Sequence, residues 1–312
     1  MSSPPEWAPE RVIDVALARR TIADQFPELA GQPVRSFDAG WDNLVLAVGD
    51  EWLFRFIHRS VALTGAAREL AVLRLLDDRF SLAIPRPVFV GSPTAEVSWP
   101  FWGARALPGR GLAESGMPDD ERAGVAAALG AFLRELHSPH LAEQATQAAE
   151  AEGLTLPVDP IGRSRPSSLA PRARLRLDDV TRSGGAFPRS AVADVLAAAE
   201  VLGAPAGDPV LVHGDLHVRH VLVADGRATG VIDWGDTALA DPSVDLMIAF
   251  MAFTDSARAA FFGAYGEIDP DQELRARACA VHVAAALAQS AIQQGLKTVA
   301  TEALDGLRRA TV

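Results

Sequence analysis

HGDLHVRHVLVADGRATGVIDWGD, residues 213–236, is the stretch of this chain that carries the most information about its fold. Two apolar, β-branched runs flank Asp225-Gly226, a dipeptide that favours the tight turn of a β-hairpin. Asp215 precedes the first run, and Asp233 follows the second. When two such runs pair as antiparallel strands, their outer ends meet, so both carboxylates are predicted to face one cleft.

The positions of the two carboxylates suit two different chemical roles. A carboxylate on a tight loop, such as Asp215, can accept a proton from a hydroxyl when His213 or the adjacent backbone holds it in place. A carboxylate at the end of a strand, such as Asp233, is a good ligand for Mg²⁺, which prefers oxygen donors and keeps waters and substrate phosphates in its shell. The spacing therefore predicts a base and a metal ligand in one site.

Composition excludes several classes of partner. With 312 residues, 49% of them hydrophobic and 22% charged, the chain is long enough to bury a core and to form one large domain or two lobes. A net charge of -11 and a pI near 5.1 argue against a nucleic acid or an anionic membrane as partner, because phosphate groups select clustered Lys and Arg. We therefore expect a globular protein, whose acidity suits a cationic ligand.

The N-terminal sequence and the cysteine content predict a cytoplasmic protein. MSSPPEWAPERVID lacks the basic start and apolar run of a secretory peptide. The longest apolar stretches, such as residues 246–253, are far shorter than the ~20 residues of a membrane span. The single cysteine, Cys279, cannot form an internal disulfide. Of the 29 basic residues only Lys297 is a lysine, so a site that needs a cation must almost always use arginine.

The N-terminal third alternates between helical and strand patterns. A helix is expected near residues 9–25, and three antiparallel strands are expected over residues 34–59. Residues 64–80 read as a helix with Thr64 as N-cap, and Glu69 lies on its apolar stripe. A buried carboxylate requires a cation. Residues 84–109 suggest two further strands that end at Pro108-Gly109.

The remainder is mainly helical. The stripe Val125, Leu129, Phe132 and Leu136 predicts a helix over residues 119–137. Residues 153–188 have weaker periodicity, whereas residues 271–294 and 299–310 read as helices. We therefore predict an α+β fold with an N-terminal lobe, residues 1–107, built from an antiparallel sheet plus a helix. A larger, mainly helical C-terminal lobe is predicted to comprise residues 108–312.

The segment HGDLH at 213–217, followed by Ile232-Asp233-Trp234-Gly235, resembles the catalytic segment of the aminoglycoside phosphotransferase family, which has the two-lobed protein-kinase-like fold. Protein kinases have an HRD catalytic loop, an asparagine five residues after its aspartate, and DFG. The resemblance implies a kinase that transfers the γ-phosphoryl group of ATP or GTP to a small-molecule hydroxyl. It makes Asp215 the catalytic base and Asp233 a Mg²⁺ ligand, and it gives Asp236, Asp241 and Asp245 loop-bracing roles.

The same resemblance assigns a nucleotide site to the N-terminal lobe. Arg55, on the third strand, takes the place of the lysine that binds the α- and β-phosphates, and Glu69 is its partner. Backbone groups from Arg105 to Leu107 are expected to bind the nucleotide base, and the turn from Gly40 to Asn43 is expected to cover the phosphates, although it lacks a GxGxxG pattern.

One position departs from the family pattern. His220 stands five residues after Asp215, where most members have the metal-binding asparagine. Mg²⁺ prefers oxygen to imidazole nitrogen, so this substitution either weakens catalysis or retunes the metal site. Histidine at this position also resembles the macrolide phosphotransferase branch. We expect His220 and Asp233 to be the metal ligands.

Alternatives remain open at the level of sequence. The acceptor is an antibiotic of the macrolide or aminoglycoside class, or an unrelated metabolite hydroxyl; the apolar segments 244–266 and 271–294, read as walls of the acceptor pocket, favour a macrolide-like acceptor. A degenerate kinase-like binding module is a second reading, against which the intact Asp215 and Asp233 argue. A zinc hydrolase using His213, His217 and His220 is a third, but on a strand these spacings do not place all three histidines on one face.

Overall fold

The structure, a computed structural model, describes residues 10–39 and 43–312. These residues form two compact units. The N-terminal unit contains the described residues of Met1–Asp77 together with Ile84–Leu107, and the C-terminal unit contains Asp78–Ala83 and Pro108–Val312. The short segment Asp78–Ala83 belongs to the second unit because Ala83 forms a β-bridge with Gly230.

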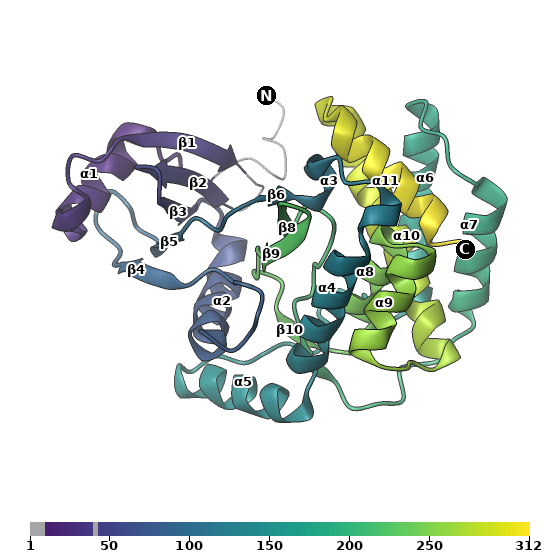
Figure 1. The fold of residues 1–312 in the computed structure, drawn as a ribbon. Coiled ribbons are helices and arrows are strands. Elements are labelled where there is room, and N and C mark those ends of the chain that lie inside the picture. The colour runs from purple at the N-terminus through teal and green to yellow at the C-terminus, as the bar shows by residue number, and fades with distance from the viewer. Residues whose placement is uncertain (1–9, 40–42) are drawn as a thin grey trace. The chain divides into compact units, whose positions relative to one another are not determined.

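The N-terminal unit is built on one antiparallel sheet (Figure 1). The predicted meander is confirmed, since β2 pairs with both β1 and β3. Two further strands, also as predicted, extend the sheet in the order β1-β2-β3-β5-β4. Helices α1 and α2 complete the unit. The bounds of these elements are α1 Val15–Gln25, β1 Val34–Ala39, β2 Asn43–Val48, β3 Trp52–Ile57, α2 Leu63–Leu76, β4 Pro87–Gly91 and β5 Phe101–Arg105.

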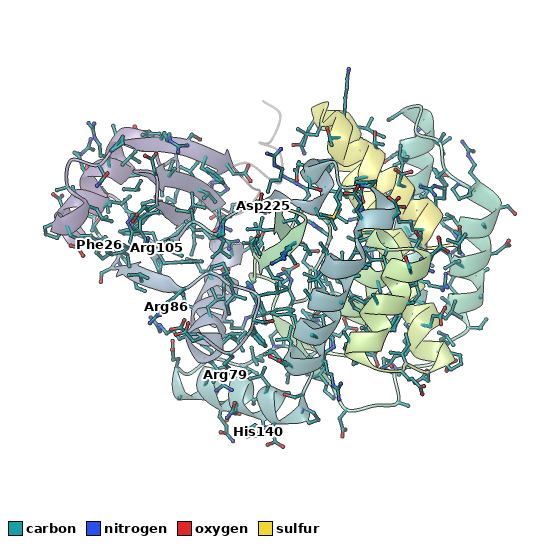
Figure 2. The ribbon with its side chains drawn as sticks, viewed as in Figure 1. Phe26, Arg79, Arg86, Arg105, His140 and Asp225 are labelled. Carbon is teal, nitrogen blue, oxygen red and sulfur yellow. The ribbon has the colours of Figure 1, made fainter. Side chains whose placement is uncertain are left out.

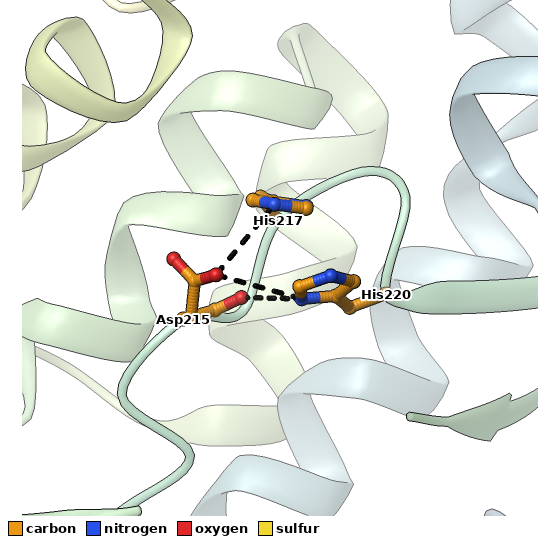
Figure 3. Close-up of side chains that lie close together, drawn as sticks. All are labelled: Asp215, His217 and His220. Atoms are coloured by element: carbon orange, nitrogen blue, oxygen red, sulfur yellow. Dashed lines mark hydrogen bonds and ion pairs between the residues drawn. The ribbon is translucent and has the colours of Figure 1, made fainter. Parts of the chain in front are cut away.

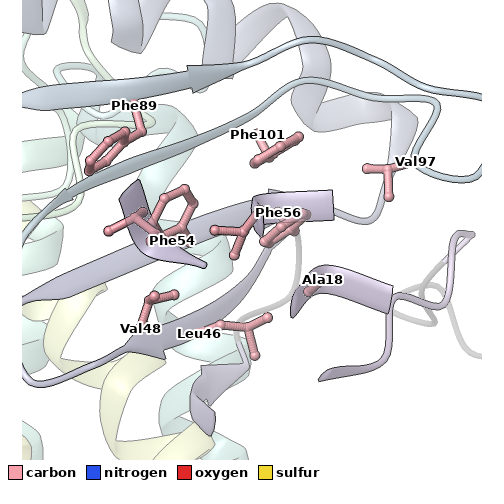
Figure 4. Packing of buried hydrophobic residues seen from close by; sticks show 10 residues of the cluster. Ala18, Leu46, Val48, Phe54, Phe56, Phe89, Val97 and Phe101 are labelled. Carbon is pink, nitrogen blue, oxygen red and sulfur yellow. The ribbon is translucent and has the colours of Figure 1, made fainter. Parts of the chain in front are cut away.

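Aromatic side chains fill one face of this sheet (Figure 4). Phe54 and Phe56 lie two positions apart on β3, so their rings point to the same face. The rings of Phe56 and Phe101 stack with their centroids 4.6 Å apart. Ala18 and Ile22 of α1 cover the cluster and are themselves buried. The sheet and α1 therefore share one hydrophobic core.

Helix α2 differs from its prediction at both ends. It begins at Leu63 after Ala62, which makes no side-chain cap hydrogen bond, so the prediction of Thr64 as N-cap is wrong. It ends at Leu76, and Asp78 then adopts a left-handed φ of 56° that turns the chain. Phe80 consequently lies outside the helix, where its ring packs 4.7 Å from that of Phe132 in the C-terminal unit.

The C-terminal unit is mainly helical, with two small sheets in the orders β6-β8-β9 and β10-β7. The predicted helix α4, with Val125 on its buried face, is confirmed. The two predicted C-terminal helices, α10 and α11, are confirmed as well. The region of weak periodicity contains a helix, α6. None of the helices in the described part of the chain is long and apolar enough to cross a membrane. The bounds are β6 Arg110–Gly111, α3 Leu112–Ser115, α4 Ala123–Leu136, α5 Pro139–Ala151, α6 Pro166–Arg182, α7 Arg189–Glu200, β7 Val210–Val212, β8 Val221–Ala224, β9 Arg227–Val231, β10 Ala238–Ala240, α8 Ser243–Ala252, α9 Asp255–Tyr265, α10 Pro270–Gln294 and α11 Lys297–Arg309.

The apolar residues of α8 belong to the core of this unit. All ten residues of Ser243–Ala252 are buried, and α8 packs against α10 and α11. More than half of α10 is buried as well, from Arg275 to Ala291. The prediction that segments 244–266 and 271–294 form an apolar wall for an acceptor is therefore wrong for α8, because a helix buried on every side has no face left for a ligand.

Candidate functional site

The predicted hairpin is present in the C-terminal unit. Strands β8 and β9 pair antiparallel, and the turn between them is Asp225-Gly226. Both turn residues have positive φ, 49° and 74°, as a type I′ turn requires. Figure 2 labels Asp225 at this turn. The dipeptide therefore sets the pairing next to the turn, and after a register shift between Leu222 and Val223 the strands bring the segments before β8 and after β9 together.

The loop before β8 is braced by Asp245. This carboxylate is fully buried and accepts hydrogen bonds from the backbone N–H groups of His213, at 2.7 Å, and Gly214, at 2.9 Å. Gly214 has a φ of 89°, and a Cβ there would lie 2.2 Å from the carbonyl oxygen of Asp236, so only glycine fits. His137 Nε2 also lies 3.2 Å from Oδ2 of Asp245, the oxygen that accepts from the N–H of His213. The predicted bracing role of Asp245 is confirmed.

His213 ties this loop to the residues before Asp233. Its Nε2 donates to the carbonyl of Ile232 at 2.9 Å, while its Nδ1 accepts from the N–H of Asp215 at 3.2 Å. The ring is completely buried, and this burial lowers the pKa of His213, so the ring is held neutral. It acts as a hydrogen-bonding support for the loop.

Asp215 has two carboxylate oxygens in different surroundings. Its Oδ1 lies 3.0 Å from Arg163 Nη2, whereas its Oδ2 lies 3.7 Å from His217 Nε2 and 3.9 Å from His220 Nδ1 (Figure 3). Burial by itself raises the pKa of Asp215, but the charge of Arg163, with smaller contributions from His217 and His220, outweighs it and lowers the pKa to about 2. Asp215 is therefore an ionised acceptor with Oδ2 left for a partner.

His220 connects Asp215 to Asp233. Its Nδ1 lies 2.8 Å from the carbonyl oxygen of Asp215, and a carbonyl only accepts, so Nδ1 carries the proton. In the neutral ring the lone pair is then on Nε2, which lies 3.4 Å from Asp233 Oδ2. A carboxylate and an imidazole lone pair facing each other suit a divalent cation that completes its shell with water and phosphate oxygens. The prediction that Asp215 and Asp233 meet at one end of the hairpin is confirmed.

The histidines are arranged differently from the prediction. Residues 216–220 are not in a strand, and residues 218–220 form a turn in which the N–H of His220 donates to the carbonyl of His217 at 2.9 Å. The rings of His217 and His220 therefore lie 3.8 Å apart, and with Asp215 they place one donor atom each within 4.8 Å of one another. The prediction that these spacings do not bring all three histidines together agrees with this group, although the turn does bring His217 and His220 together. His213 does not belong to the group.

Within the N-terminal unit, Arg55 and Glu69 form the predicted ion pair. Arg55 Nη1 lies 2.7 Å from Glu69 Oε1, and the Glu69 side chain is only 2% exposed. With its amide oxygen turned toward the arginine, Asn43 accepts from Arg55 Nη2 at 3.0 Å and from Nε at 3.1 Å. Strand β2 and helix α2 thus hold the guanidinium of β3 from two directions.

The other predicted nucleotide contacts are only partly described. The side chain of Arg105, labelled in Figure 2, is exposed, pairs with Glu51 at 3.2 Å and lies 4.9 Å from the ring centre of Trp52. The N–H of Ala106 already donates to the carbonyl of Glu51 at 2.7 Å. Leu107 is the last residue of the unit. Of the turn expected over the phosphates, residues 40–42 lie outside the described residues.

Sequence reasoning missed Arg163. Its guanidinium contacts Asp215, Asp236 at 3.0 Å and the carbonyl of Gly214. It lies in an irregular segment between α5 and α6, where no periodicity marks a buried face. The scattered prolines and arginines of residues 153–188 were the only sequence signal, and they do not indicate which arginine reaches the hairpin.

Two sequence comparisons point the same way. The sequence model of the phosphotransferase enzyme family matches residues 33–289. A stretch of 70 residues, 22% of this chain, is 34% identical to an aminoglycoside 3'-phosphotransferase of Escherichia coli and covers 26% of that protein. Another stretch, of 58 residues or 18% of this chain, is 36% identical to the uncharacterized protein YcbJ of Bacillus subtilis (strain 168) and covers 19% of that protein. The matches thus span about a quarter or less of these curated relatives.

Solved structures match over nearly the whole chain. The GDP and kanamycin complex of APH(2")-IIia has a TM-score of 0.64 and 24% identity, with 93% of this chain and 96% of that chain covered. The macrolide 2'-phosphotransferase MphH from Brachybacterium faecium has a TM-score of 0.57 and 24% identity, with 94% and 97% covered. At these identities the likeness shows the fold. The predicted kinase-like α+β fold, with an N-terminal antiparallel sheet and a mainly helical C-terminal part, is confirmed.

Proposed function

Because the chain belongs to the phosphotransferase enzyme family, we propose that it transfers the γ-phosphoryl group of ATP or GTP to a hydroxyl group of a small molecule. The observation that carries this proposal is the arrangement around the hairpin. Asp215 keeps Oδ2 open, and His220 directs its Nε2 lone pair at Asp233. An acceptor oxygen and a metal-bound phosphate need such neighbouring groups.

Asp215 is assigned to the acceptor. Its Oδ2 would accept a hydrogen bond from the acceptor hydroxyl and take its proton as the oxygen attacks phosphorus. A pKa of about 2 makes Asp215 a weak base, and its main contribution is then orientation of the hydroxyl. This suits phosphoryl transfer, whose loose transition state draws little on the strength of the base.

His220 and Asp233 are assigned to Mg²⁺. The ion, when bound, would neutralise charge on the phosphates. Asp233 Oδ2 would supply an oxygen ligand and His220 Nε2 a nitrogen ligand, while the hydrogen bond from His220 Nδ1 to the Asp215 carbonyl fixes the ring orientation.

The N-terminal unit is assigned to the nucleotide. Arg55 would bind the α- and β-phosphates, because Glu69 and Asn43 fix its guanidinium in one orientation. Backbone groups from Arg105 to Leu107 would bind the base. Of these groups, the N–H of Ala106 is already used within the unit, so the neighbouring groups would have to serve.

For the acceptor, we propose an antibiotic hydroxyl. The similar structures include a kanamycin complex of an aminoglycoside enzyme and a macrolide phosphotransferase, and His220 favours the macrolide class by its resemblance to that branch. The burial of α8 removes that helix from the predicted apolar wall and so weakens the wall as a separate argument. A metabolite hydroxyl of another class remains the alternative acceptor.

The test is a panel of macrolides, aminoglycosides and simple amino alcohols, each incubated with ATP or GTP and Mg²⁺ and examined by mass spectrometry. A phosphate adduct that disappears in Asp215→Asn but persists in Asp225→Asn, a carboxylate removed from the exposed hairpin turn, supports the proposal. Phosphate adducts on aminoglycosides alone would contradict the preference for a macrolide acceptor but would still support the phosphotransferase assignment. No transfer to any acceptor or to water would favour a binding module.

A zinc hydrolase is the second candidate, and one observation favours it. Asp215, His217 and His220 offer donor atoms within 4.8 Å of one another, and mixed carboxylate and imidazole ligands suit Zn²⁺. Metal analysis of the purified protein separates the two functions, because stoichiometric, tightly held zinc would support hydrolysis and contradict the kinase assignment.

A further inference from the structure

The guanidinium of Arg163 is directed entirely at the loop that carries Asp215. Nη2 lies 3.0 Å from Asp215 Oδ1, Nη1 lies 3.0 Å from Asp236 Oδ2, and Nη1 also donates to the carbonyl of Gly214. Among the described residues, every hydrogen-bond and ion-pair partner of this side chain belongs to the segment 214–236. The side chain is only 15% exposed.

The segment that presents Arg163 is itself fixed from two sides. The N–H of Asp159 donates to the carbonyl of Leu239 at 2.8 Å, which joins the segment to β10. The Asp159 carboxylate accepts from Ser164 Oγ at 2.6 Å. The buried Arg275 of α10 donates to the carbonyl of Ser164 at 3.2 Å. The position of Arg163 is therefore supported by contacts outside the segment 214–236 that it reaches.

This geometry makes the two oxygens of Asp215 unequal. Oδ1 is engaged by a charged donor, whereas the nearest histidine nitrogens lie 3.7 Å and 3.9 Å from Oδ2, beyond hydrogen-bond distance. A carboxylate free to rotate would offer both oxygens in many orientations. One held at Oδ1 offers a single oxygen in a single orientation, which is what attack by a bound hydroxyl requires.

We propose that Arg163 is a positioning residue that holds Asp215 by Oδ1 and leaves Oδ2 to bind the acceptor hydroxyl. The inference rests on the proposed phosphotransferase function and adds to it a residue that no motif identifies. Arg163 touches neither the acceptor nor the nucleotide in this assignment. It acts through Asp215, and it also holds the residue before that carboxylate by the Gly214 carbonyl and the segment after β9 by Asp236.

The experiment compares Arg163→Gln and Arg163→Lys with Arg165→Gln. Arg165 lies in the same segment, is 60% exposed and approaches only Asp159, at 3.9 Å, among the described residues, so it controls for loss of one charge there. We expect Arg163→Gln to lower kcat by roughly 10²-fold, the scale of a misplaced reactive group, with the KM for ATP unchanged. Arg163→Lys, which keeps the charge but not the forked contact, should recover part of that loss.

A double-mutant cycle with Asp215→Asn separates positioning from general support of the fold. If Arg163 acts through Asp215, Arg163→Gln should lower the residual turnover of Asp215→Asn by less than twofold. Melting temperatures of all variants show whether they remain folded. If Arg163→Gln is unfolded, the turnover of Arg163→Lys is compared with that of Arg165→Gln instead.

Three outcomes would overturn the inference. Turnover of Arg163→Gln equal to that of Arg165→Gln, or a full further loss of about 10²-fold in the Asp215→Asn background, would show that Arg163 does not act through Asp215 while the kinase assignment stands. A wild-type protein that transfers phosphate to neither an acceptor nor water would overturn the proposed function, and the inference with it.

Discussion

Two arginine–carboxylate pairs, Arg55–Glu69 in the N-terminal unit and Arg163–Asp215 in the C-terminal unit, have nearly equal arginine exposure, 18% and 15%. Their carboxylates differ, since Glu69 is 2% exposed and Asp215 is 26% exposed. Glu69 is enclosed by its unit, whereas Asp215 keeps one oxygen open. The first pair fixes a cation by burying its anion, and the second fixes an anion that stays partly exposed.

The supports of the two pairs differ in the same way. Arg55 and Glu69 lie on a strand and a helix, whose regular geometry holds side chains in place. Arg163 and Asp215 lie on irregular segments, and each segment is held by long-range hydrogen bonds to buried groups such as Asp245 and Arg275. Regular elements suffice for a pair whose carboxylate is buried. The partly exposed carboxylate on a loop has additional supports.

Breaking the second pair should have the largest effect on activity. Asp215→Asn removes the acceptor of the hydroxyl proton, and a group in this role typically contributes about 10²- to 10⁴-fold, so turnover should fall by that factor. Nucleotide affinity, measured by calorimetric titration, should stay unchanged because Arg55 and Glu69 are intact. Equal turnover in mutant and wild type would remove Asp215 from the reaction.

Breaking the Arg55–Glu69 pair should instead affect stability and ATP binding more than turnover. Glu69→Gln removes the buried charge opposite Arg55, and we expect the free energy of unfolding to fall by about 1.5–3 kcal/mol, the range for a hydrogen bond to a charged group. The KM for ATP should rise more than kcat falls, since the orientation of Arg55 is lost. Glu51→Gln, which alters an exposed pair with Arg105, is the control in urea denaturation. An unchanged KM for ATP would limit Glu69 to a structural role.

Acid titration of His282 tests the surroundings of the second pair, because Arg163 is one of three arginines whose charges act on this histidine. Burial, and after it the positive charges of Arg176, Arg172 and Arg163, lower the pKa of His282 to about 3. Arg176 Nη1 donates a hydrogen bond to His282 Nε2 at 3.1 Å. The unfolded state takes up a proton near pH 6.5 and the folded state does not until about pH 3, so His282 makes stability decline as the pH falls through that window.

His282→Gln should therefore reduce the decline in unfolding free energy between pH 6 and pH 4 by up to about 1.4 kcal/mol per pH unit, the value for one proton. Chemical denaturation at several pH values measures this slope. His140→Gln, on the exposed side of α5 (Figure 2), controls for the loss of a histidine elsewhere. The same slope in His282→Gln and wild type would mean that this ring is protonated in the folded protein.

The smallest expected effect concerns the metal. His220→Asn replaces an imidazole by an amide oxygen, which Mg²⁺ prefers, so the ratio of activity with Mg²⁺ to activity with Mn²⁺ should rise by a few-fold. Steady-state assays over a range of each metal ion measure it. An unchanged ratio would show that His220 Nε2 does not bind the metal, and would leave the residue its hydrogen bond to the Asp215 carbonyl.

The sequence by itself determined the features that depend on local periodicity and turn chemistry. Asp225-Gly226 fixes the tight turn because both turn residues must adopt positive φ, and the antiparallel pairing that follows brings Asp215 and Asp233 to one end, despite a register shift between Leu222 and Val223. The apolar stripe of α2 places Glu69 inside, and burial of a carboxylate implies the cation that Arg55 supplies. These inferences succeed because each needs only neighbours a few residues away.

Tertiary structure alone decided the rest. Periodicity shows that a face is buried but not what covers it, so α8 appeared to be a pocket wall when other helices enclose it on every side. The apolar pattern of α2 continues to Phe80, yet the chain turns at Asp78 and gives Phe80 to the other unit. Arg163 reaches Asp215 because hydrogen bonds to β10 and α10 fix its segment, and contacts between such distant parts of the chain leave no local pattern in the sequence.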